Sequence, residues 1–334
     1  MKKKSLIFTF LVSLFILFCS FILSLFFGAE KITDFKTIIA QSASEIQNFQ
    51  KIIFFNIRLP RSLLVLLSGV LLAGAGSIFQ LFFRNPLAEP GLIGISSGAT
   101  LGAVCTQVFG ITVSAVLIPA TNLFAFLGAI LSGSIVTIFA FRKSTRESTV
   151  MLLLCGTALG TLYSAISSLI ILSNTNKLQS IYAWNLGSFS GKTWNELFFI
   201  LIPAVISIVT MFLLSPSLDL LSVGEKSAQS LGVDIKKIRI LVLLSGALAA
   251  SASVCAGGTI SFVGLVAPHI ARKIAGPKAK TLLPFSMCFG AILLLLSDTL
   301  ARTVIAPAEI PTGIITSILG VPFFISLVSR ESKK

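Results

Sequence analysis

Very few side chains in this sequence could do chemistry in an apolar environment. The single histidine, His269, follows Pro268, and a lone histidine at a proline kink is more typical of a structural hydrogen-bonding group than of a metal ligand or proton relay. Asp298 is the only carboxylate well inside an apolar segment, and Arg302, four residues later, is its expected ion-pair partner on a helix. This scarcity of acids disfavours a proton- or sodium-driven carrier and favours an external energy source.

Catalysis and cofactor binding have equally little support. The sequence lacks the Gly-x-x-x-x-Gly-Lys-Ser/Thr motif, so the chain cannot hydrolyse ATP through a P-loop. No nucleophile and base are paired within an apolar segment, which disfavours an intramembrane enzyme. The cysteines are odd in number and without metal-ligand spacing, and all lie in apolar runs: Cys19, Cys105, Cys155, Cys255 and Cys288. We predict no catalytic residue, no resident cofactor and no metal site.

The elements that position these residues are predicted to be membrane helices. Of the 334 residues, 55% are hydrophobic and 11% are charged, against roughly 25% charged in a soluble domain. Apolar runs of about 20 residues recur, and each is long enough to cross a bilayer as a helix. We therefore predict an all-α polytopic membrane protein with about ten transmembrane helices. The predicted spans are 6–27, 62–83, 92–118, 123–141, 149–172, 197–215, 238–256, 259–273, 281–305 and 312–328.

The basic residues orient these spans. The net charge is +14, but the cations are scattered between apolar runs, which disfavours a nucleic-acid-binding surface. With both termini cytoplasmic, 18 of the 26 lysines and arginines fall inside, as the positive-inside rule requires. The short eighth span, which contains Pro268, is kept because dropping it would move the basic C-terminus outside. The first run, Ser5 to Phe27, is too long for a cleavable signal and is taken as the first helix.

The sequence also contains an internal repeat. Val65 to Gly76 matches Val242 to Ser253 at a constant offset, and five crossings separate them, so the two copies run in opposite directions. We predict a single transmembrane domain over 1–334, with repeat one at about 58–172, the sixth helix and a cytoplasmic loop at 197–237, and repeat two at about 238–328. Glycines four residues apart, as at Gly94, Gly98 and Gly102, predict close helix packing.

Two further regions could bind partners. Arg58, Arg61 and Arg302 fall on the outside, where cations are rare, and arginine pairs well with carboxylates of an acidic protein. Snorkelling to lipid phosphate is the alternative, and the residue types do not choose between them. Inside, Pro216 to Gly232 is predicted as one or two short amphipathic helices.

Several multi-residue motifs occur in a characteristic order along the chain. They are Arg58-Leu59-Pro60-Arg61, Arg84 to Ala99 (RNPLAEPGLIGISSGA), Phe262 to Arg272 (FVGLVAPHIAR), Asp298 to Arg302 (DTLAR), Ala308 to Ile314 (AEIPTGI) and Gly320 to Phe324 (GVPFF). On these motifs the chain resembles the iron-chelate, haem and vitamin B12 permease family of ATP-binding-cassette (ABC) importers. The resemblance runs from about Arg58 to Val328.

The resemblance implies a subunit of the cytoplasmic membrane that works with a second permease subunit, as a homodimer or with a close paralogue. It also implies two cytoplasmic ATPase subunits and an extracytoplasmic substrate-binding protein. The implied cargo is a metal chelate: an iron(III)-siderophore is expected first, with haem and cobalamin as alternatives. A secondary carrier that works alone is the more distant reading.

The resemblance further implies roles for individual residues. It assigns docking of the binding protein to Arg58, Arg61 and Arg302. Apart from the resemblance, we predict structural roles for Pro268, His269, Asp298 and Glu309. Coupling to the ATPase is implied for Ser222, Gly224, Glu225, Ser227, Ala228, Leu231 and Gly232. A pathway or gate role is implied for Asn85, Pro86, Glu89, Pro90, Gly91, Ser96, Ser97 and Gly98.

Overall fold

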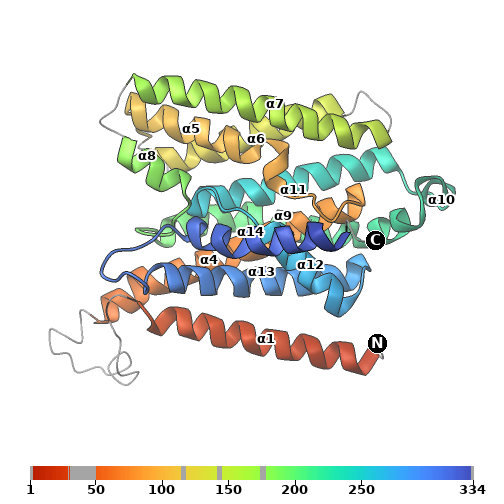
Figure 1. Cartoon of the computed structure of the whole chain (residues 1–334), viewed down its shortest axis with the longest axis horizontal. Coiled ribbons are helices and arrows are strands. Elements are labelled where there is room, and N and C mark those ends of the chain that lie inside the picture. Colours follow the sequence, from red (N-terminus) through yellow and green to blue (C-terminus); the bar gives the residue numbers. More distant parts are fainter. Residues whose placement is uncertain are drawn as a thin grey trace.

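The computed structural model describes residues 3–28, 30, 50–113, 118–140, 145–173 and 178–331, and in these ranges the regular structure is entirely helical. The long helices lie side by side (Figure 1). The helices are α1 (Lys3–Phe26), the π-helical turn η1 (Ile53–Arg58), α4 (Leu59–Phe83), the 3₁₀ turn η2 (Pro90–Ile93), α5 (Ile95–Phe109), α6 (Ala120–Ala140), α7 (Thr145–Leu172), α8 (Leu178–Asn185), α9 (Trp194–Val223), α10 (Glu225–Ser230), α11 (Ile235–Gly257), α12 (Val263–Ala275), α13 (Ala279–Ala301) and α14 (Thr312–Glu331). The all-α prediction is confirmed.

Each of the ten predicted spans overlaps one of these helices. Seven of the described helices are long and apolar enough to cross a membrane: α1, α4 with the turn before it, α6, α7, α9, α11 and α13. Shorter apolar helices, α5 and the apolar part of α14 (Thr312–Leu327), match two more predicted spans. The remaining one, α12, has 13 residues, or roughly 20 Å, and is too short for a full crossing of roughly 30 Å.

Several predicted boundaries were wrong, for local backbone reasons. The third helix ends at Phe109, well before 118, because Gly110 adopts a left-handed conformation (φ 63°) that ends it. The eighth begins only at Val263, because Phe262 is left-handed (φ 67°). The sixth helix continues to Val223 instead of ending at 215, so Pro216 lies inside α9 and only α10 is a separate helix in the segment predicted as amphipathic.

The bundle has α4 and α11 at its centre. In each of these two helices 78% of the apolar window is buried, whereas in α1 and α7 only 11% is buried. Figure 1 shows the reason, since α1 and α7 lie at opposite edges of the bundle. Both chain termini and α10 lie at one end of the bundle, which we call the α10 end; the opposite end, where α8 lies, is the α8 end (Figure 1).

Close backbone contact at glycines holds the centre together, as predicted. A Cβ atom added to Gly76 on α4 would lie 1.8 Å from the carbonyl oxygen of Gly264 on α12. At Gly98 on α5 it would lie 2.5 Å from the carbonyl oxygen of Gly128 on α6. Only glycine permits such approaches, so these positions fix the distances between helices.

The predicted inverted repeat stays a proposal, which the helix packing supports. The first central helix, α4, packs extensively on α13, and its expected counterpart, α11, packs on α6. In each half, the short helix also packs on the long helix that follows it: α5 on α6, and α12 on α13. Several cations used to predict orientation lie outside the described residues: Lys2, Lys31, Lys36, Arg142, Lys143, Lys177, Lys333 and Lys334.

Candidate functional site

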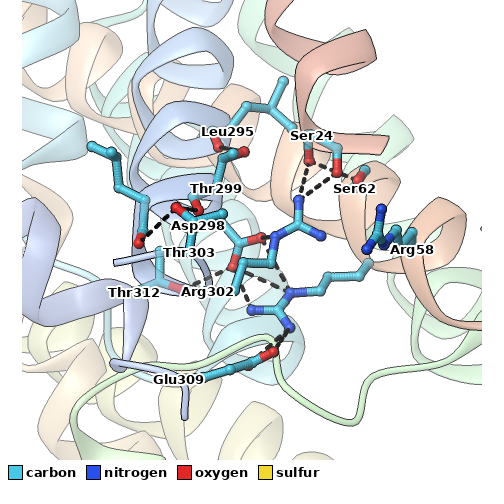
Figure 2. A network of polar contacts seen from close by, with 12 residues as sticks. Ser24, Arg58, Ser62, Leu295, Asp298, Thr299, Arg302, Thr303, Glu309 and Thr312 are labelled. Carbon is cyan, nitrogen blue, oxygen red and sulfur yellow. Dashed lines mark hydrogen bonds and ion pairs between the residues drawn. The ribbon is translucent and has the colours of Figure 1, made fainter. Parts of the chain in front are cut away.

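A buried cluster of charged residues lies where α1, α4 and α13 meet (Figure 2). Asp298 on α13 is fully buried and binds Arg61 on α4 through Arg61 Nη2 to Oδ1 at 2.9 Å and Arg61 Nε to Oδ2 at 3.1 Å. Arg302 Nε lies 3.3 Å from the same carboxylate, which confirms the pair predicted from the spacing. Thr312 Oγ1 donates a further hydrogen bond of 3.0 Å to Oδ1. One carboxylate therefore holds three segments together.

The second acid of the cluster is Glu309, in the segment between α13 and α14. Arg61 Nη1 donates to both Glu309 carboxylate oxygens at 2.9 Å. The Glu309 side chain is 30% exposed, compared with 6% for Arg61 and 0% for Asp298. Arg61 is therefore shared between a buried carboxylate and one at the surface. We call Arg58, Arg61, Asp298, Arg302 and Glu309 the arginine network.

The other two arginines of the network bind the C-terminal end of α1. Arg302 Nη2 donates to the carbonyl of Ser24 at 2.5 Å and to its hydroxyl at 2.8 Å. Arg58 Nη1 donates to the carbonyls of Leu25 at 3.0 Å and Phe26 at 2.7 Å, and Arg58 Nη2 donates to the carbonyl of Glu30. The C-terminus of a helix carries partial negative charge. It therefore balances the excess of three guanidinium groups over two carboxylates.

These bonds bear on the predicted docking role of the three arginines. Arg58 is only 4% exposed, Arg61 5% and Arg302 3%. All three bind groups of this chain. An acidic partner would have to displace an internal acceptor to reach them. Docking therefore stays a prediction. The sequence analysis did not identify Ser24 or Thr312. The one sequence signal for Ser24 is its spacing from Ser13 and Ser20, which places the three serines on one face of α1. All three are buried in the structure.

The predicted gate segment forms a compact turn at the α10 end of α4. Asn85 Oδ1 accepts a hydrogen bond from the Leu87 N–H at 2.9 Å, which closes the turn before Pro90. Glu89 accepts a hydrogen bond from the backbone N–H of Phe262. Burial raises the pKa of this carboxyl group, although the Phe262 hydrogen bond opposes the shift. The motifs Arg84 to Ala99 and Phe262 to Arg272, which are far apart in sequence, thus meet at this turn.

The remaining predicted gate residues form the start of α5. Ser96 and Ser97 are partly buried, and a Cβ atom added to Gly160 on α7 would lie 3.2 Å from Ser97 Oγ. Gly98 contacts α6, as described above. Pro86 lies in the turn itself, and Gly91 lies in η2 and is exposed. The structure brings these residues together, and their gate role stays a prediction.

The predicted coupling residues lie at the α10 end. Gly224 (φ 149°) and Gly232 (φ 85°) have positive φ angles and flank α10, whose Ala228 is buried against the bundle. Ser222 and Ser227 are exposed and Glu225 is partly buried. Large apolar residues are exposed here, with Val223 78% and Leu231 66% exposed. Exposed apolar groups on a segment beyond the predicted spans suit contact with a soluble partner.

The histidine motif joins two helices. The His269 ring on α12 lies 5.5 Å from the Phe323 ring on α14, edge to face, and Pro268 is buried. This geometry fits the predicted structural role. Among the described residues, no group of three His, Cys, Asp or Glu side chains is placed to hold a metal ion.

The comparisons with known proteins give this bundle a family. The family model of the FecCD transport family matches residues 15–330. The chain belongs to the FecCD transport family. This FecCD permease is 37% identical to the Fe(3+)-citrate import system permease protein YfmE of Bacillus subtilis, over 83% of this chain and 82% of the relative. It is also 37% identical to the hemin transport system permease protein HmuU of Yersinia pestis, over 84% of each.

A solved structure supports the same assignment. It is described as an inward-facing conformation of a metal-chelate type ABC transporter, and it matches the FecCD permease with a TM-score of 0.83 and 33% identity. The match covers 96% of this chain and 99% of the other. The chain is therefore the multi-pass permease subunit of an ABC importer, and it is not itself the ATPase.

Proposed function

We propose that this FecCD permease carries an iron(III) chelate of the siderophore class across the cytoplasmic membrane. The observation that supports this cargo is that three relatives with iron-chelate names are 35–37% identical: two Fe(3+)-citrate permeases and the iron(3+)-hydroxamate permease FhuG of Bacillus subtilis. Relatives with other cargo names are 35–39% identical: the hemin permease above (37%), a cobalamin permease (BtuC, Halobacterium salinarum, 35%) and a molybdate permease (MolB, Haemophilus influenzae, 39%). The uptake experiment below therefore compares iron chelates with haem, cobalamin and molybdate.

The proposed assembly contains two permease subunits, two ATPase subunits and an extracytoplasmic binding protein. An exposed row of small polar residues on α7 supports pairing, because lipid is a poor solvent for it: Thr157, Thr161, Ser164 and Ser168. Thr157 and Thr161 donate to carbonyls of their own helix, so they would offer a passing chelate only weak contacts. Such a surface suits a water-filled pathway between two copies.

The proposed orientation puts both termini and α10 in the cytoplasm. The arrangement of the helices supports this, since all three lie at one end of the bundle (Figure 1). The ATPase would then contact α10 and the exposed Val223 and Leu231, and the binding protein would dock at the α8 end. ATP binding would draw the two ATPases together, move both α10 segments and open the paired bundles alternately to each side.

The cargo is tested by uptake into proteoliposomes that contain the permease, its ATPases and its binding protein. We expect ATP-dependent uptake of ⁵⁵Fe-labelled hydroxamate or citrate chelates to exceed uptake of haem, cobalamin and molybdate at least tenfold. Preference for one of the other three cargoes would overturn the iron assignment and leave the importer assignment intact. Uptake that is unchanged without ATPase subunits, under a proton gradient, would instead indicate a secondary carrier.

A further inference from the structure

The last two turns of α9 are bonded to the start of α13. Asp219 Oδ1 accepts a hydrogen bond of 2.5 Å from the backbone N–H of Ala279, 60 residues further along the chain. Ala279 is the first residue of α13 and is fully buried. The first N–H groups of a helix have no acceptor within the helix, so they need one from elsewhere.

The residue at the N-cap of α13 does not provide that acceptor. Lys278 occupies the N-cap position, and its side chain makes no capping hydrogen bond, since lysine carries donors only. The N-termini of α9 and α11, by contrast, are capped by their own N-cap residues, Thr193 and Asp234. Asp219 therefore caps α13 from another helix, and so it fixes where α9 lies relative to α13.

A second contact ties the same part of α9 to α4. Arg84, the left-handed C-cap of α4, donates from Nη2 to the carbonyl of Leu221, two residues beyond Asp219. The adjoining α10 packs against α9 and also touches α11. The end of α9 is thus the point at which the proposed coupling segment meets both α4 and α13.

The far end of α13 carries the arginine network. Asp298 follows Ala279 by 19 residues, so the two lie roughly 28 Å apart along the helix. Asp298 binds Arg61 on α4, and Arg302 at the C-cap of α13 binds the end of α1. A displacement of the first turn of α13 would therefore reach residues at the opposite end of the bundle through one helix.

We propose that Asp219 is a positioning residue that transmits movement of the α9–α10 segment to α13, and through α13 to the arginine network. The inference rests on the proposed function, in which α10 contacts the ATPase. Loss of the Asp219–Ala279 bond is expected to separate ATP hydrolysis from transport without preventing assembly.

The test uses the complete complex in proteoliposomes, with ATP hydrolysis and cargo uptake measured on the same vesicles. We expect Asp219→Ala to lower the cargo transported per ATP at least fivefold. Asp219→Asn keeps an acceptor oxygen and should retain more than half of the wild-type ratio. Asp234→Ala is the matched control, because it removes an aspartate cap at the same end of the bundle from a helix that caps itself. It should leave the ratio unchanged.

A double variant separates transmission from simple capping. Lys278→Asp places an acceptor at the N-cap of α13, where it can accept from the N–H groups of the next two residues after Ala279. Asp219→Ala combined with Lys278→Asp therefore has a cap that is local to α13. We expect the double variant to recover the thermal stability of the wild type while its cargo per ATP stays at least fivefold low. Full recovery of the ratio, or a wild-type ratio in Asp219→Ala, would overturn the proposal.

One further measurement distinguishes this failure from failure of the proposed function. A photo-crosslinking amino acid at Gln229, which is exposed on α10, should capture the ATPase subunit. Capture with an unchanged ratio in Asp219→Ala would refute only the role of Asp219. Absence of capture would refute the contact between α10 and the ATPase.

Discussion

Arg61 on α4 donates hydrogen bonds from Nε and Nη2 to the Asp298 carboxylate on α13, although 237 residues separate the pair in sequence. Both side chains are buried, and the helices that carry them touch again at Gly69 and Gly290, where an added Cβ atom on Gly69 would lie 2.5 Å from the Gly290 carbonyl oxygen. Polar bonding and close backbone packing thus act on the same helix pair. This pair links the two predicted halves of the chain.

Removal of Asp298 is expected to destabilise the permease strongly. Asp298→Ala leaves Arg61 and Arg302 as buried charges without their shared acceptor, and breaking a buried pair costs about 3–5 kcal/mol. Thr312→Val removes only one hydrogen bond to the same carboxylate and should cost about 1 kcal/mol. Thermal unfolding of the detergent-purified protein measures both. Equal losses in the two variants would contradict the central place of Asp298.

Glu309 is expected to compete with any acidic partner for Arg61. If the binding protein docks on the arginines, Glu309→Gln weakens the internal competitor at Arg61 Nη1 and should raise the affinity of the binding protein about threefold to tenfold. Titration of labelled binding protein against the reconstituted permease gives this affinity. Lower affinity would show instead that Glu309 holds the docking surface in shape, and unchanged affinity would remove Arg61 from the interface.

Gly76 is expected to tolerate no side chain. In Gly76→Ala the new methyl group meets the backbone of Gly264, which cannot move away as a flexible side chain could, so α4 and α12 must separate. Overpacking of this kind costs about 1–3 kcal/mol. Gly91→Ala is the matched control, because the nearest atom to its added Cβ is a Glu89 carboxylate oxygen at 3.5 Å. Thermal unfolding should separate the two variants clearly.

Glu89 is expected to make stability depend on pH. Burial raises the pKa of its carboxyl group above the ordinary 4.5, so the folded protein holds this proton more tightly than the unfolded chain. The group therefore lowers stability progressively as the pH rises from about 4.5 through the raised pKa. Glu89→Gln should have a higher melting temperature than the wild type at pH 7.5 and a similar one near pH 4. The opposite order would show that the ionised carboxylate stabilises the turn.

The architecture follows from the sequence more directly than the site does. Continuous apolar runs predict the ten helices, and the spacing of Asp298 and Arg302 predicts their contact, because both signals are local. The ends of α5 and α12 were missed because they depend on left-handed backbone at Gly110 and Phe262, and nothing about a phenylalanine predicts that conformation. A prediction from hydropathy extends each helix to the next polar residue and so places these boundaries too far out.

The partners within the arginine network could not be predicted for a different reason. Arg58 and Arg61 look exposed in sequence because they lie just before the predicted span 62–83, next to a polar stretch. Their acceptors are a carboxylate on another helix and the backbone carbonyls of α1. Backbone carbonyls carry no sequence signal, and tertiary packing alone decides which helix end approaches an arginine. The Asp219–Ala279 contact was missed on the same grounds.

The attachment of α1 has a consequence for how the chain is assembled in the membrane. Its last carbonyls are bound by Arg58, which follows closely in sequence, and by Arg302, which lies 278 residues beyond Ser24. The contact between Ser24 on α1 and Arg302 can therefore form only after α13 has been synthesised and inserted. Only then is its final partner available, so the oldest part of the polypeptide is among the last to reach its finished surroundings.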